Sequence, residues 1–135
     1  MVRPGGRVAI HAWTADSGVG AIFRLAARYA PPPAGLPSPF AWGDPAHVRG
    51  LLGGTFGEFR FESHDCPEFC DSAEELADFW IEMYGPTHRT VGSLPPQKAA
   101  EFRSELVRLF DSYVTPADGK VRWGREYLIT IATRL

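Results

Sequence analysis

The chain has 135 residues, of which 44% are hydrophobic and 13% aromatic, and its formal net charge is −2. This length suits one domain, and the aromatic content excludes a disordered chain. With 16 acidic against 14 basic residues there is no positive excess to attract nucleic acid. No apolar run is long enough to span a bilayer, and the first residues lack the apolar stretch of a secretory signal. We therefore expect a cytoplasmic protein whose partners include neither nucleic acid nor membrane.

The first predicted element is a strand at Arg7–Trp13, directly after a Pro-Gly-Gly turn. Its nearly continuous apolar run is typical of a strand buried on both faces, as in a parallel sheet. Within this strand we expect His11 to be a buried and hydrogen-bonded polar group.

A helix is predicted next, because apolar residues recur at helical spacing over 19–27. Either Asp16 or Ser17 can cap its start, and Pro31 ends it. The proline-rich stretch Pro31–Pro39 can be neither helix nor central strand, so we interpret it as a loop that packs over the domain.

The spacing then predicts a short helix over 45–52, with Asp44 as its N-cap and Pro45 at its first position. Gly53-Gly54 ends this helix. Phenylalanines alternate with charged residues over Glu58–His64, which predicts a strand.

Ser72-Ala73-Glu74-Glu75 has the pattern of a capping box and predicts the start of a helix that Gly85-Pro86 closes. A longer helix is predicted from Pro96 to Tyr113, and Asp118-Gly119 indicates a turn. The last predicted strand is Glu126–Thr133. Three strands separated by helices favour a layered α/β arrangement.

The residues Arg3–Ile10, which run Arg-Pro-Gly-Gly-Arg-Val-Ala-Ile, resemble the turn and fifth strand of class I S-adenosylmethionine-dependent methyltransferases. The resemblance is to the group that methylates quinones and other small molecules, in which a leucine stands in place of Val2. Pro31–Leu52, the turn Tyr84–Thr87 and the closing Thr133-Arg134 are also similar to that group. The resemblance covers nearly the whole chain, but it corresponds to the second half of such an enzyme.

The resemblance implies a fold with strand order 3-2-1-4-5-7-6, in which strand 7 is antiparallel. Arg7–Trp13 then corresponds to strand 5, Glu58–His64 to strand 6 and Glu126–Thr133 to strand 7. The helices from Ser72 to Val114 form an insertion that covers the acceptor substrate in this family. The expected fold is a partial Rossmann-like domain over residues 1–135, with a three-stranded mixed sheet in the order 5, 7, 6.

The resemblance also implies that the intact enzyme uses S-adenosylmethionine. A cofactor site of this kind needs a glycine-rich turn after a strand and a carboxylate for the ribose hydroxyls. Gly18-Val19-Gly20 and the glycines of 50–57 lack that context. We therefore expect no cofactor-binding residue in this chain, which would lack the N-terminal half of the fold and be inactive alone.

Five residues are candidates for an acceptor site. Trp13 and Thr14 lie at the C-terminal end of the first strand, where open α/β sheets bind their ligands. Trp42 can form an apolar wall, Tyr84 can reach a pocket, and His88 is a weak candidate for a general base toward a hydroxyl acceptor. Packing in the core is the alternative for each aromatic residue.

Cys66, Cys70 and the nearby His64 are residue types that bind metals, but a zinc site needs a second pair of ligands and none is nearby. We interpret the segment as the end of a strand that leads to a capped helix, and we expect no metal site. A reversible disulfide between the two cysteines is the open alternative.

The leading interpretation is that this chain supplies the acceptor side of a methyltransferase that acts on a small molecule. The alternatives are a non-catalytic truncated paralogue or assembly partner, and an unrelated small α+β ligand-binding domain. Because strand 4 is not in the chain, we expect unpaired amides at Val8, Ile10 and Trp13 along one edge. A homo-oligomer, or a chain that supplies the missing half, would cover this edge.

Overall fold

The computed structural model describes residues 2–135 and shows an α/β fold. Over this described range, none of the helices is both long and apolar enough to cross a membrane. The elements in chain order are β1 (Arg7–Trp13), α1 (Gly18–Tyr29), the 3-10 helix η1 (Pro39–Gly43), α2 (Pro45–Leu52), β2 (Phe56–Asp65), β3 (Glu68–Cys70), α3 (Ala73–Met83), α4 (Gly85–Gly92), α5 (Pro96–Tyr113), β4 (Val114–Ala117), β5 (Lys120–Trp123) and β6 (Glu126–Arg134).

The chain divides into two compact units. Unit 1 contains Met1–Gly20, of which Val2 onward is described, together with Pro37–Cys66 and Arg125–Leu135. Unit 2 contains Ala21–Leu36 and Pro67–Gly124. Each unit has its own three-stranded antiparallel sheet. The prediction that residues 1–135 form one domain stays a prediction.

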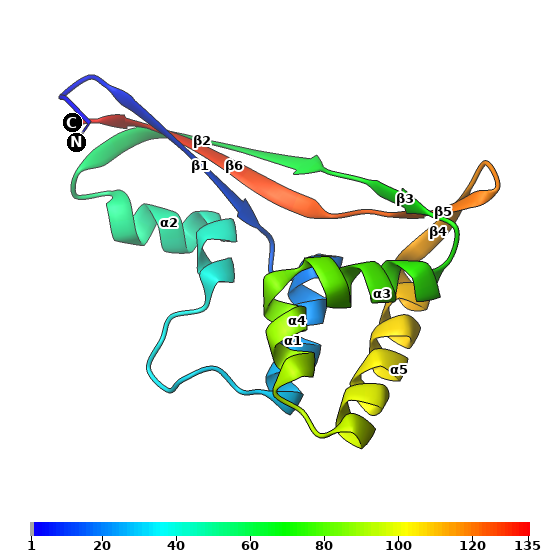
Figure 1. The fold of residues 1–135 in the computed structure, drawn as a ribbon. Helices are drawn as coiled ribbons and strands as arrows, with labels where there is room; N and C mark the ends of the chain where they lie inside the picture. Colours follow the sequence, from blue (N-terminus) through cyan, green and yellow to red (C-terminus); the bar gives the residue numbers. More distant parts are fainter. Residues whose placement is uncertain (1) are drawn as a thin grey trace. The chain divides into compact units, whose positions relative to one another are not determined.

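In unit 1 the last strand along the chain is the central strand of the sheet (Figure 1). β6 pairs with β1 from Arg7↔Thr133 to Trp13↔Tyr127, and it pairs with β2 on its other side. The strands thus lie in the expected order, but the expected mixed sheet is not confirmed, because both neighbouring pairs are antiparallel. A parallel pair would need a further strand beside β1 or β2.

The two faces of this sheet differ in burial. On one face Leu128, Thr130 and Ala132 of β6 are buried. Phe61, which pairs with Thr130, lies under the guanidinium of Arg49 of α2 at 4.8 Å from the ring centroid, so α2 covers this face. The opposite face carries the odd-numbered residues of β1 and β6 and is more exposed.

β1 forms one edge of the sheet. Hydrogen bonds from Thr14 N to Glu126 O and from Arg134 N to Gly6 O show that even-numbered residues face β6. The odd-numbered residues therefore turn their N–H and C=O groups to the outer edge. The prediction that Val8 and Ile10 carry the unpaired amides is wrong, because the register directs both residues to β6.

Unit 2 is built around aromatic side chains from three elements. Trp80 of α3 and Phe110 of α5 each contact Trp123 of β5 edge to face, with ring centroids 4.9 Å apart in both pairs. All three side chains are buried. Their mutual packing fixes α3 and α5 against the second sheet, whose strand order is β3-β5-β4.

Some short elements of unit 2 depart from the prediction. Gly85-Pro86 was expected to close a helix, yet it also begins α4. Proline suits the first turn of a helix, where its missing N–H has no partner to lose. The strands β3, β4 and β5 were not predicted, although the turn at Asp118-Gly119 is confirmed by positive φ angles of 49° and 79°.

Candidate functional site

The C-terminal end of β1 leads into α1 through a tight turn. Thr14 donates from N to Glu126 O (3.3 Å) and from Oγ1 to Glu126 Oε1 (2.9 Å). The Thr14 carbonyl accepts from Ser17 Oγ (2.7 Å), and Ser17 Oγ accepts from Gly20 N (3.3 Å). The hydroxyl of Thr14 therefore ties the end of β1 to the start of β6, and Ser17 rather than Asp16 caps the helix.

Trp13 belongs to a row of aromatic side chains on the more exposed face of the unit 1 sheet. The Tyr127 ring lies 5.9 Å from Trp13, 4.4 Å from His11 and 5.6 Å from His64 between centroids. The Arg125 guanidinium lies 5.8 Å from the Trp13 ring. The prediction of a buried His11 is wrong, because odd-numbered residues of β1 face this exposed side.

Trp42 lies in η1, beside the same end of β1. A Cβ atom added to the next residue, Gly43, would stand 2.3 Å from the Trp13 carbonyl oxygen, so η1 and β1 are in close backbone contact. The Trp42 side chain keeps 36% of its surface exposed. The structure thus brings Trp13, Thr14 and the turn that carries Trp42 to one end of β1.

Tyr84 lies in unit 2, where α3 ends and α4 begins. Its ring packs on Trp80 at 4.4 Å and meets Phe23 edge to face at 6.2 Å. Burial raises the pKa of Tyr84, so its hydroxyl stays protonated at neutral pH and can donate a hydrogen bond.

His88 is exposed on α4, and its Nδ1 lies 3.2 Å from the carbonyl oxygen of Ile81. A carbonyl can only accept, so Nδ1 carries the hydrogen and Nε2 of the neutral ring keeps a free lone pair. The helix that carries His88 is itself held in place, because the buried Thr87 hydroxyl donates toward the carbonyls of Trp80 and Tyr84 at the end of α3. Nε2 of His88 can therefore act as a proton acceptor from a fixed orientation.

The two cysteines are free thiols in separate units. Cys66 Sγ lies 3.5 Å from a guanidinium nitrogen of Arg125, and Cys70 Sγ donates to the Ser72 carbonyl at 3.4 Å. Burial raises the pKa of the Cys70 thiol, which lowers its reactivity. Within residues 2–135 no group of three or more His, Cys, Asp or Glu side chains could hold a metal ion.

The candidate site residues fall into two groups, with Trp13, Thr14 and Trp42 in unit 1 and Tyr84 and His88 in unit 2. Tyr127, the central ring of the aromatic row, is not among the residues predicted from the sequence. The predicted strands contain enough information to find it. If Arg7–Trp13 and Glu126–Thr133 pair antiparallel with Arg7 opposite Thr133, then Tyr127 lies opposite Trp13.

Comparison with known proteins finds relatives of about twice the length. No family model matches the chain. It is 32% identical over 138 residues to the uncharacterized protein Rv1405c of Mycobacterium tuberculosis and equally to the uncharacterized protein Mb1440c of Mycobacterium bovis. Each alignment covers 99% of this chain and 49% of the relative. The chain thus spans about half the length of the curated relatives that it matches.

Proposed function

We propose that this chain is the acceptor-binding half of a class I methyltransferase, which transfers a methyl group from S-adenosylmethionine to a small molecule. The observation that carries the proposal is the strand order of unit 1. The last strand lies between the other two and is antiparallel to both, which is the order 5, 7, 6 that the resemblance implies.

The length of the relatives supports the same proposal. A complete domain of this family needs further strands and the glycine-rich turn that binds the cofactor. Rv1405c and Mb1440c contain about as many residues outside the matched region as within it. That additional length is sufficient for the further strands and the cofactor-binding turn of such a domain.

Neither glycine-rich segment of the described chain has the form of the turn that binds S-adenosylmethionine. A Cβ on Gly20 would lie 2.1 Å from the Ala15 carbonyl oxygen, so the turn itself uses the space that this glycine leaves free. Gly50 lies inside α2 and Gly54 follows that helix, so neither glycine comes directly after a strand as the cofactor-binding turn requires. We assign cofactor binding to polypeptide outside this chain.

The proposed tasks of this chain are to orient the acceptor and to remove its proton. Trp13 and Trp42 supply apolar walls, while Thr14 fixes the end of the strand that carries the first wall. Taken by itself, unit 2 offers Nε2 of His88 as a general base for a hydroxyl acceptor and the protonated Tyr84 as a hydrogen-bond donor. Correct positioning contributes most to an in-line transfer of this kind.

A chimera tests the proposal, with this chain in place of the matched half of Rv1405c. We expect the folded chimera to bind S-adenosylmethionine in a calorimeter and to transfer its tritiated methyl group to small phenols, whereas this chain alone gives no heat. His88→Gln should slow the transfer and leave cofactor affinity unchanged. A folded chimera and an intact Rv1405c that both fail to bind the cofactor would overturn the proposal.

The alternative is a non-catalytic assembly partner that pairs through the edge of β1. The observation in its favour is that the N–H and C=O groups of Arg7, Ala9 and His11 point away from β6 along an edge strand. Self-association of this chain, together with a chimera that binds no cofactor, would favour this alternative.

A further inference from the structure

Unit 2 has a hollow that shares no residue with the candidate site. It lies between α1 and α5 and has a volume of about 390 Å³, within the usual range for sites that bind small molecules. Its lining consists of Ala21, Arg24, Leu25 and Arg28 from α1 and Glu105, Arg108 and Leu109 from α5.

The inner part of the hollow is apolar. Ala21 and Leu25 are four residues apart on α1, so they lie on the same face of that helix, and they are 8% and 5% exposed. Leu109 is the apolar contribution of α5 and is half-buried. Since Ala21 and Leu25 are already almost fully buried, a ligand would remove apolar surface from water mainly at Leu109.

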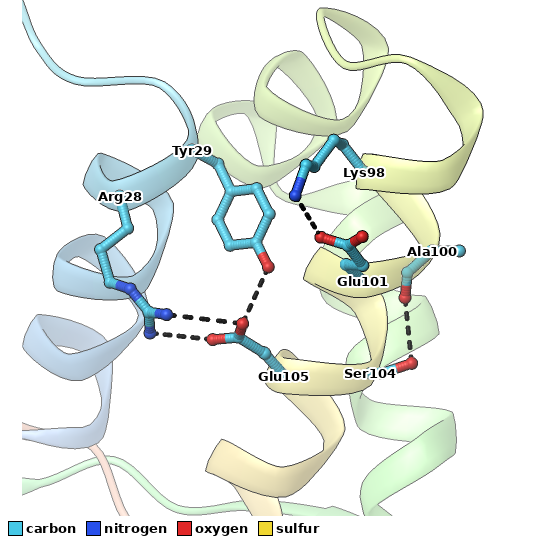
Figure 2. A network of polar contacts seen from close by, with 7 residues as sticks. All are labelled: Arg28, Tyr29, Lys98, Ala100, Glu101, Ser104 and Glu105. Carbon is cyan, nitrogen blue, oxygen red and sulfur yellow. Dashed lines mark hydrogen bonds and ion pairs between the residues drawn. The ribbon is translucent and has the colours of Figure 1, made fainter.

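The carboxylate in the lining is already neutralised by its neighbours (Figure 2). Glu105 Oε2 pairs with Arg28 Nη1 at 2.8 Å, and Oε1 accepts from Arg28 Nη2 at 3.5 Å and from Tyr29 Oη at 2.9 Å. Both oxygens are therefore engaged, and Glu105 has little capacity left for repelling or binding a ligand.

The arginines give the hollow an excess of positive charge. Arg108 is exposed and forms no hydrogen bond or ion pair within residues 2–135, so its charge is not neutralised there. Arg24 adds a second guanidinium to the lining. A guanidinium can bind a carboxylate through two parallel hydrogen bonds, so this rim suits an anionic group.

We propose that this hollow binds a small organic anion with an apolar body, of which a medium-chain carboxylate is the simplest form. The carboxylate pairs with Arg108 on the rim beside Arg24, and the hydrocarbon chain lies on Leu25 and Leu109. This binding is independent of methyl transfer.

Octanoate is the probe, titrated into the whole chain while amide NMR shifts are followed. We expect saturable shifts at the amides of α1 and α5 that line the hollow. Acetate has the charge without the apolar body, and octan-1-ol has the body without the charge, so both should bind at least about tenfold more weakly. Equal affinity for octanoate and either of these compounds would overturn the proposal.

Four variants locate the site. Arg108→Gln should weaken octanoate binding about tenfold or more, and Arg108→Lys should weaken it less because the charge remains. Arg89→Gln is the matched control, since this exposed arginine of α4 does not line the hollow, and it should bind like the wild type. Glu105→Gln should bind more tightly, because Arg28 loses its internal carboxylate. Equal losses in the two arginine-to-glutamine variants would place binding elsewhere.

Discussion

At the scale of single residues, the turn from β1 to α1 depends on the missing side chain of Gly20. An added Cβ would lie 2.1 Å from the Ala15 carbonyl oxygen, and a backbone atom cannot rotate away as a side chain can. We expect Gly20→Ala to lower the free energy of unfolding by about 2 kcal/mol or more, measured by urea denaturation.

Gly50→Ala is the matched control for this change. Gly50 lies inside α2 with no atom within 4 Å of an added Cβ, so alanine should leave stability unchanged or raise it by up to about 1 kcal/mol. If Gly20→Ala and Gly50→Ala lower the free energy of unfolding equally, the contact with the Ala15 carbonyl oxygen is not the cause of the loss.

The ion pair between Asp78 of α3 and Arg103 of α5 gives a pH-dependent prediction. Its N···O distances are 2.6 and 2.8 Å, and the hydrogen bond from Arg103 lowers the pKa of Asp78. A lowered carboxyl pKa stabilises the fold at neutral pH, and this contribution is lost as the pH falls through the lowered pKa.

Asp78→Asn should therefore reduce stability near pH 7, by less than about 1 kcal/mol because water screens this exposed pair. The difference from the wild type should shrink in acid, below about pH 4. Urea denaturation across this pH range measures it. Asp111→Asn, an exposed aspartate on α5 with no ion pair in the described chain, should show no such trend. If the difference in the free energy of unfolding between Asp78→Asn and the wild type stays constant into acid, the ion pair with Arg103 does not cause it.

At the scale of elements, α4 is held to the end of α3 by the buried hydroxyl of Thr87. Thr87→Val keeps the shape of the side chain but leaves two carbonyls without this donor. We expect a loss of about 1–3 kcal/mol and faster amide hydrogen exchange in α4. Thr115→Val, at an exposed position of β4, should change neither quantity.

The elements that the sequence predicts are those with local signals. Ser72 Oγ accepts from Glu75 N at 3.1 Å, and Glu75 Oε2 accepts from Asp71 N at 2.6 Å, as expected near a capping box. Asp44 caps α2 as predicted, with Oδ1 2.8 Å from Ala46 N. These contacts join residues two to four positions apart, so composition and spacing along the chain are enough to find them.

The elements that the sequence misses depend on contacts between distant segments. β3 and β4 are three and four residues long, and β4 contains Pro116, so neither has a strand pattern of its own. Both form because they pair with β5. In the same way, no local pattern links Tyr29 to Glu105, which meet only after α1 and α5 have packed.

At the scale of the whole molecule, the open edge of β1 gives a prediction about assembly. The N–H of Ala9 points away from β6, so a proline there removes no hydrogen bond within the sheet but blocks pairing with another edge. We expect the wild type to self-associate in analytical ultracentrifugation, and Ala9→Pro to be a monomer with a similar melting temperature.

Ile10→Pro is the contrasting variant, because the N–H of Ile10 faces β6 and its loss should destabilise unit 1. A wild type that remains monomeric at high concentration, with rapid exchange of the Ala9 and His11 amides, would contradict edge pairing.

The central position of β6 has a consequence for the order of events during translation. All of unit 2 leaves the ribosome before β6 does, while β1 and β2 leave earlier and have no partner in the sheet until then. Unit 2 can therefore fold first, and the sheet of unit 1 closes late through contacts of high sequence separation, such as Arg7 with Thr133. Until that closure the nascent chain exposes two unpaired strands, so its demand for chaperones should fall once β6 has emerged.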